Sequence, residues 1–139
     1  MRTIFWEDNL VKMIDQRRLP NALEILTCRT HAEVAHAITD MAIRGAPAIG
    51  VAAAFGLALA AQESSAWTPE GLLADLRSAA ALLRASRPTA INLAWALDRV
   101  MRKVLSQDYP TGAGSSVLRK VVLDEAQRHA DEDVEINQR

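Results

Sequence analysis

The sequence predicts an α+β fold, with a small antiparallel sheet of about three strands in residues 1–28 and a mainly helical bundle of about five helices in residues 30–139. β-Branched and aromatic residues open the chain, and apolar spacing takes a helical period from Thr30 onward. Proline and glycine then divide this second part into segments. With 139 residues, half of them hydrophobic, the chain can fill one core without a metal or a disulfide.

The first 28 residues predict a hairpin and one further strand. Residues 3–6 are β-branched or aromatic, residues 7–9 (Glu-Asp-Asn) have turn chemistry, and residues 10–14 can return as the partner strand. Residues 22–28 can add a third strand after a polar stretch. These segments together form the expected antiparallel sheet.

The first two helices are predicted from capping and apolar spacing. Thr30 and Glu33 have the spacing of a capping box, so this helix is expected to run to about Ile43 and to stop at Gly45. The second helix begins near Pro47 and is apolar on every side, which places it inside the bundle. Its apolar run falls short of the roughly 20 residues that a membrane span requires.

Three more helices follow. Thr68-Pro69 caps and opens the third, Pro88 is expected to open the fourth, and a loop over residues 109–116 precedes the fifth. The residues expected on the buried side of the fourth helix are Ile91, Ala94, Trp95, Leu97, Met101, Val104 and Leu105. The acidic stretch over residues 131–135 opposes the dipole of the last helix, so we expect the chain to be a truncated one.

Charge and cysteine usage narrow the functional classes. The net charge is −1 with both signs interspersed, so neither a nucleic acid nor an anionic membrane surface is an expected partner. No signal peptide opens the chain, and the single cysteine, Cys28, cannot form an internal disulfide. We therefore expect a cytoplasmic protein, with Cys28 as a small buried hydrophobe rather than a nucleophile.

An anion site is predicted where the second helix begins. Arg44 and Gly45 come directly before Ala46 and Pro47, and the N–H groups in the first turn of a helix have no internal partners. Arg87-Pro88 repeats the pattern at the fourth helix. Two such starts suggest one shared phosphorylated ligand, although solvated loop arginines remain the alternative at this point.

Other polar residues give weaker indications. His31 and His36 are five positions apart and do not share a helical face, so we do not expect them to bind a metal. His129 and Asp133 have a spacing compatible with a metal pair, but without a third ligand we favour a surface pair. For Asn92 we favour a local capping bond over a ligand contact.

Several motifs in order closely resemble the S-methyl-5-thioribose-1-phosphate isomerases of methionine salvage, over essentially the whole chain. They are TIFWEDN at residues 3–9, MIDQR at 13–17, MAIRGAPAIGVAAA at 41–54, RPTAINL at 87–93 and DVEIN at 133–137. More distantly, the chain resembles ribose-1,5-bisphosphate isomerases and the regulatory subunits of translation initiation factor 2B.

The resemblance implies the N-terminal domain of an aldose–ketose isomerase that converts 5-methylthioribose 1-phosphate to 5-methylthioribulose 1-phosphate. The family's substrate contacts map onto Arg44, Gly45, Ala46 and Arg87. Its catalytic aspartate and cysteine lie in a C-terminal Rossmann-like domain that is absent here, so no catalytic residue is expected in this chain. No metal or nucleotide cofactor is expected. The implied partners are the phosphorylated thiosugar, the C-terminal domain of the same enzyme and a second copy in a homo-oligomer.

Three interpretations of the short chain remain. It is a piece of an isomerase that is inactive alone, a stand-alone domain that binds a sugar phosphate without catalysis, or a regulatory subunit like those of the initiation factor. The continuous match favours the first.

Overall fold

The computed structural model describes residues 3–43, 45–108 and 114–137, with the backbone alone for the last four. Three strands precede five helices, which confirms the predicted α+β fold. The elements are β1 (Ile4–Glu7), β2 (Leu10–Ile14), β3 (Ile25–Cys28), α1 (His31–Thr39), α2 (Ala46–Glu63), α3 (Pro69–Ser86), α4 (Ile91–Leu105) and α5 (Ser116–Asn137).

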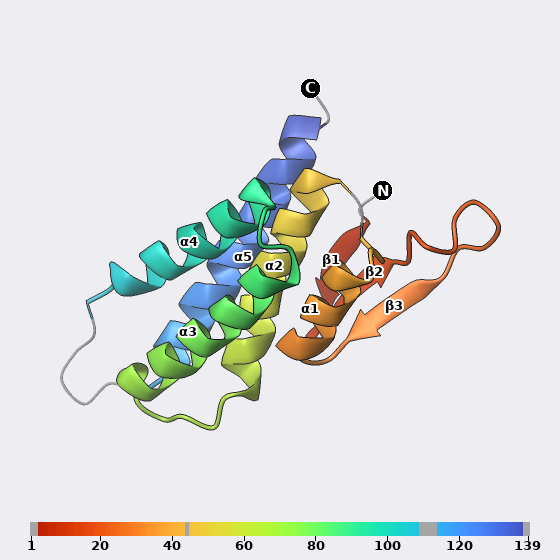
Figure 1. The fold of residues 1–139 in the computed structure, drawn as a ribbon. Coiled ribbons are helices and arrows are strands. Elements are labelled where there is room, and N and C mark those ends of the chain that lie inside the picture. Colours follow the sequence, from red (N-terminus) through yellow and green to blue (C-terminus); the bar gives the residue numbers. More distant parts are fainter. Residues whose placement is uncertain (1–2, 44, 109–113, 138–139) are drawn as a thin grey trace.

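Helix α2 is the centre of the molecule. It contacts every other helix as well as β1 and β2, with α3, α4 and α5 on one side and α1 with the sheet on the other (Figure 1). Thirteen of its 18 residues are buried. By length and composition alone α2 could cross a membrane, so our expectation that it is too short was wrong. Its apolar surface is instead covered by the bundle, because its small side chains let neighbouring helices approach closely.

The sheet is a meander in the order β1-β2-β3 with antiparallel pairing throughout. Asp8 and Asn9 both have positive φ, of 55° and 62°, which suits a two-residue hairpin turn. β3 is shorter than expected and begins at Ile25, although the Glu24 carbonyl still accepts a hydrogen bond from the Asp15 N–H at 2.9 Å. The ring of Trp6 stacks on Phe55 with a centroid distance of 5.9 Å, and this contact joins the sheet to α2.

Helix α1 begins as predicted but ends four residues early. The Oγ1 of Thr30 accepts a hydrogen bond from the Glu33 N–H at 3.1 Å. At the other end Met41 adopts φ 62°, and the Ala42 N–H donates to the carbonyl of Ala37 at 3.0 Å. This is a Schellman closure made without glycine, so the sequence carried no stop signal at that point.

Helix α4 differs from the prediction in where it begins and in which face it buries. It begins at Ile91 rather than at Pro88, because Arg87 still caps α3 and a turn follows, with the Ala90 N–H bonded to the Arg87 carbonyl at 3.0 Å. Its buried residues are Leu93, Ala96, Leu97, Val100 and Val104. Ile91 and Trp95, which we expected inside, are 82% and 52% exposed. The helix is therefore rotated relative to the predicted face.

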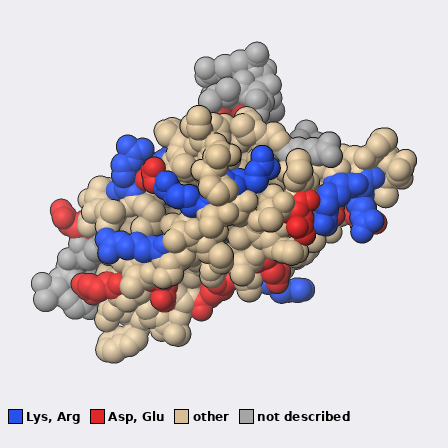
Figure 2. Space-filling model, in the orientation of Figure 1, with Lys and Arg blue, Asp and Glu red and all other residues tan. Residues whose placement is uncertain are grey.

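Charged residues of both signs are interspersed on the face of the molecule in Figure 2, as the composition predicted. Exposed ion pairs lie on the surfaces of the helices, such as Arg84 of α3 with Asp98 of α4 at 2.6 Å. Such exposed pairs contribute little to stability.

Candidate functional site

Three of the four residues expected to contact substrate line one pocket of about 610 Å³. Gly45 and Ala46 come from the start of α2, and Arg87 comes from the end of α3. Arg44, the fourth, lies outside the described residues. The remaining walls are Met41, Ile43 and Ile49 on one side and Thr89, Ala90, Ile91 and Asn92 on the other. We call this the α2/α4 pocket.

The start of α2 gives the pocket free backbone donors. Gly45 is its N-cap, with φ 90°, and makes no side-chain capping bond. The first intrahelical bond runs from the Ile49 N–H to the Gly45 carbonyl at 3.1 Å. The N–H groups of Ala46 and Ala48 precede it, and Pro47 has none. A side chain at position 45 would meet no atom within 4 Å, so the positive φ is what favours glycine there.

The start of α4 faces the same pocket. Ala90 is its N-cap, also without a side-chain capping bond, and the first intrahelical bond joins the Ala94 N–H to the Ala90 carbonyl at 3.2 Å. Neither helix has an acidic residue in its first turn. Two helix N-termini therefore direct uncompensated partial positive charge toward one volume, which favours an anion.

Arg87 adds a full positive charge that has no carboxylate partner among the described residues. It is half-buried, and none of the described residues that line the pocket is acidic. By contrast Arg84, one turn earlier in the same helix, is paired with Asp98. The side chain of Asn92, at the pocket wall, makes no capping bond within the described part of the chain, against our expectation.

A second cavity of about 330 Å³ adjoins the first at Asn92. Arg99 organises it: its guanidinium contacts Glu125 at 3.2 Å, Glu132 at 2.6 Å and the Nδ1 of His129 at 3.1 Å. His129 is 9% exposed, so it is buried and does not lie on the surface as we expected. Burial and the adjacent Arg99 charge lower the pKa of His129, although the nearby carboxylates oppose this.

A third pocket, of about 420 Å³, lies between β3 and α1 beside Cys28. Cys28 is 1% exposed, and burial raises the pKa of its thiol to about 11. The expectation of a buried hydrophobe is confirmed. His31 pairs with Glu63 at 2.6 Å, and His36 pairs with Asp40 at 2.8 Å. Within the described ranges no three His, Cys, Asp or Glu side chains are placed to hold a metal ion.

Sequence reasoning missed the cluster of Trp95, Arg99, His129 and Glu132. A partial signal was available, because Trp95 and Arg99 are four residues apart, while His129 and Glu132 are three apart. These spacings place each pair on one helical face. Nothing local indicated that the two faces meet, since α4 and α5 are far apart in the sequence and come together through packing on each other and on α2.

Comparison with known proteins gives close relatives of one enzyme. The chain is 52% identical over 103 residues to the methylthioribose-1-phosphate isomerase of Chloroflexus aurantiacus, covering 74% of this chain and 30% of that protein. It is 42% identical over 141 residues to the isomerase of Desulforamulus reducens, covering 100% of this chain and 39% of the relative. The chain therefore spans about two fifths or less of the length of these relatives.

Solved structures agree. The 5-methylthioribose 1-phosphate isomerase of Pyrococcus horikoshii superposes with a TM-score of 0.89 at 42% identity, over 96% of this chain and 37% of that one. Subunit delta of the translation initiation factor eIF-2B from A. fulgidus superposes with a TM-score of 0.87 at 41% identity, over 97% of this chain and 38% of that one. The model of the initiation factor 2 subunit family matches residues 42–139, so the chain belongs to this family, and it resembles its methylthioribose-1-phosphate isomerase members.

Proposed function

We propose that this chain is the N-terminal, substrate-positioning part of a methylthioribose-1-phosphate isomerase, with the phosphate held in the α2/α4 pocket. The observation that carries the proposal is the unpaired Arg87 beside two uncapped helix starts, in a pocket whose described lining has no carboxylate. A phosphate meets there a guanidinium and several free N–H donors. The choice of methylthioribose as the sugar rests on the names of the similar isomerases.

In this proposal the groups that move protons belong to the remainder of the enzyme. An aldose 1-phosphate opens only when its ring oxygen is protonated, and hydrogen then moves between neighbouring carbons, which requires an acid and a base in a site without water. The single cysteine here is buried, and burial holds its thiol protonated. Asp15 is 4% exposed and held by Arg17. Neither residue lines the α2/α4 pocket.

The proposal is tested by titrating 5-methylthioribose 1-phosphate into the isotope-labelled chain and following backbone amides by NMR. We expect the largest shifts at the first-turn amides of α2 and α4. Arg87→Ala should weaken binding by about 5- to 30-fold, since a charge-assisted bond at a half-buried site contributes about 1–2 kcal/mol. Arg84→Ala is the matched control, because its partner is Asp98, and it should change binding less than about twofold.

Two results would reject the proposal: shifts that avoid both helix starts, or equal binding by Arg87→Ala and the wild type. Catalysis is assayed separately, as conversion of the aldose to the ketose phosphate by the chain alone. We expect none. Turnover by this chain would overturn the division between positioning and proton transfer.

A regulatory subunit is the second candidate function, and the likeness to eIF-2B subunit delta supports it. Such a subunit binds a ligand without converting it. The two are distinguished by an assay of the full-length protein encoded with this segment: turnover of the thioribose phosphate supports the isomerase, and binding without turnover supports the regulatory subunit.

A further inference from the structure

The second cavity contains a buried histidine whose outer ring nitrogen has no partner in the described structure. His129 is 9% exposed, and its Nδ1 lies 3.1 Å from the Nη1 of Arg99. A guanidinium has donors alone, so Nδ1 must accept, and a neutral ring then carries its hydrogen on Nε2. Its lowered pKa keeps the ring neutral near pH 7.

The Nε2–H borders open space. Among the described residues, no side-chain N or O atom that is cut off from solvent is without a hydrogen-bond partner. Nε2 makes no hydrogen bond to the described residues, so it is not cut off from solvent, and His129 is one of the residues that line the second cavity. Position 50 is glycine, and a Cβ there would come within 3.5 Å of Nε2 and 3.0 Å of the Asn92 carbonyl. Glycine therefore lets α2 approach the α4 backbone at Asn92, and a side chain at this position would also touch Nε2.

The charges of this cavity differ from those of the α2/α4 pocket. Arg99 supplies one positive charge, whereas Glu132 and Asp133 line the cavity and Glu125 contacts Arg99 from behind. With His129 neutral, the described residues that line the cavity carry one positive charge and two negative charges, so phosphate is less favoured there than in the α2/α4 pocket. A hydrogen-bond donor and carboxylate acceptors instead suit the uncharged hydroxyl groups of a sugar, and an aromatic face suits its C–H groups.

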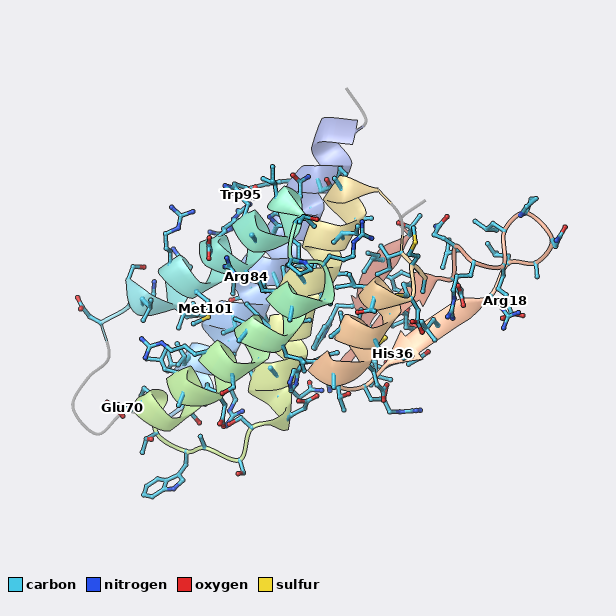
Figure 3. The ribbon with its side chains drawn as sticks, in the orientation of Figure 1. Arg18, His36, Glu70, Arg84, Trp95 and Met101 are labelled. Carbon is cyan, nitrogen blue, oxygen red and sulfur yellow. The ribbon has the colours of Figure 1, made fainter. Side chains whose placement is uncertain are left out.

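Trp95 supplies the aromatic face. Its ring lies 5.4 Å from the His129 ring, and the Cζ of Arg99 lies 5.8 Å from the Trp95 centroid. Both contacts hold the indole in place, and it is 52% exposed. Figure 3 shows Trp95 at the α4 ribbon. An exposed, fixed indole can pack against the carbon face of a sugar.

The two cavities are adjacent. Asn92 lines both, and successive residues of α2 divide between them, with Ala46 and Ile49 in one and Pro47 and Gly50 in the other. These positions lie within about one helical turn, which rises about 5.4 Å. A phosphorylated sugar can therefore extend from one cavity into the other across Asn92.

We propose that the second cavity holds the hydroxyl-bearing ring of the sugar phosphate, with the Nε2–H of His129 donating to a ring hydroxyl and Trp95 packing on the ring. This inference rests on the proposed function, because the phosphate in the α2/α4 pocket sets where the ring lies. Arg99 acts as a positioning residue that fixes the tautomer of His129.

The test compares inorganic phosphate with 5-methylthioribose 1-phosphate on the wild type, His129→Phe and His129→Gln. Phenylalanine keeps a ring beside Trp95 but has no donor, whereas glutamine restores an N–H near the Nε2 position. Affinity is measured by calorimetry or NMR titration. Imidazole ¹H–¹⁵N spectra report the tautomer, and circular dichroism verifies that each variant is folded.

We expect His129→Phe to weaken the sugar phosphate by about 3- to 10-fold, the range of one neutral hydrogen bond, and to leave inorganic phosphate within about twofold. His129→Gln should recover most of the loss. The inference is overturned if His129→Phe weakens both ligands equally, if it weakens neither, or if the free ring carries its hydrogen on Nδ1. Failure of the proposed function is a different result: neither ligand then shifts the first turns of α2 and α4 in the wild type.

Discussion

The contact between Gly56 of α2 and Leu83 of α3 gives a quantitative test of the central packing. A Cβ at position 56 would lie 3.0 Å from both Leu83 Cδ atoms and 3.4 Å from Val34 Cγ1. Leu83 is fully buried. Leu83 packs against Gly56 where a side chain at position 56 would otherwise lie. Adding a methyl group at position 56 should therefore fill part of the space left when Leu83 is shortened.

The expected magnitudes follow from these contacts. Leu83→Ala removes three buried carbons, about 2.4 kcal/mol at about 0.8 kcal/mol each. A residual void of roughly 40 Å³ adds about 1 kcal/mol, for a total near 3.4 kcal/mol. Gly56→Ala gains up to about 1 kcal/mol of helix propensity but costs about 1–3 kcal/mol in overpacking, a net loss of about 1 kcal/mol.

The double variant should lose much less free energy of unfolding than the sum of the two single variants. The new methyl then occupies the space that the leucine left, so the double variant is expected to lose about 1–2 kcal/mol rather than the additive value of about 4.4 kcal/mol. Urea unfolding followed by circular dichroism measures each free energy. The control pairs Gly56→Ala with Leu118→Ala, an equally buried leucine of α5, and should be additive within about 0.5 kcal/mol. Additivity of the Gly56 and Leu83 changes would refute this packing.

Three further predictions concern charge and burial. Hydrogen bonds from Arg17 lower the pKa of Asp15 in the folded protein. The Asp15 carboxylate therefore stabilises the fold above its unfolded-state pKa of about 3.9, and this stabilisation is lost as pH falls through its folded-state pKa. The urea midpoint should fall more steeply below about pH 4 in the wild type than in Asp15→Asn. Cys28, with a pKa of about 11, should react slowly with a thiol reagent at pH 8 and rapidly in urea, and fast native labelling would contradict its burial. Arg99→Leu should lower the free energy of unfolding by about 3 kcal/mol, because the buried Glu125 then keeps Arg128 alone of these two ion-pair partners. Adding Glu125→Leu should recover most of this loss in the same urea unfolding assay.

Local chemistry in the sequence was enough to predict much of the fold. The capping pairs at Thr30 and Thr68, and the hairpin turn after β1, are short-range features, and each appears where it was expected. The placement of α2 at the centre was also predictable, because a helix that is apolar on every side has no surface suited to water.

Helix ends and helix faces were less predictable, since they depend on contacts between distant segments. Met41 ends α1 in a left-handed conformation that its residue type does not announce. Trp95 was assigned to the core because it is apolar, yet packing on α2 selects Leu93 and Ala96 instead. Pro88 was expected to open α4, but the chain needs a turn after α3 before the next helix can begin.

The candidate site divides in the same way. The sequence by itself indicated an anion site at the arginine, glycine and alanine residues near the helix starts, because free N–H groups in a first turn are a property of any helix. Tertiary structure alone decided that the starts of α2 and α4 face one pocket and that Arg87 reaches it without a carboxylate among its described neighbours. It also decided that His129 is buried against Arg99. The physical reason is that backbone donors and caps arise within a few residues, whereas the meeting of segments some 40 residues apart is set by how the whole core packs.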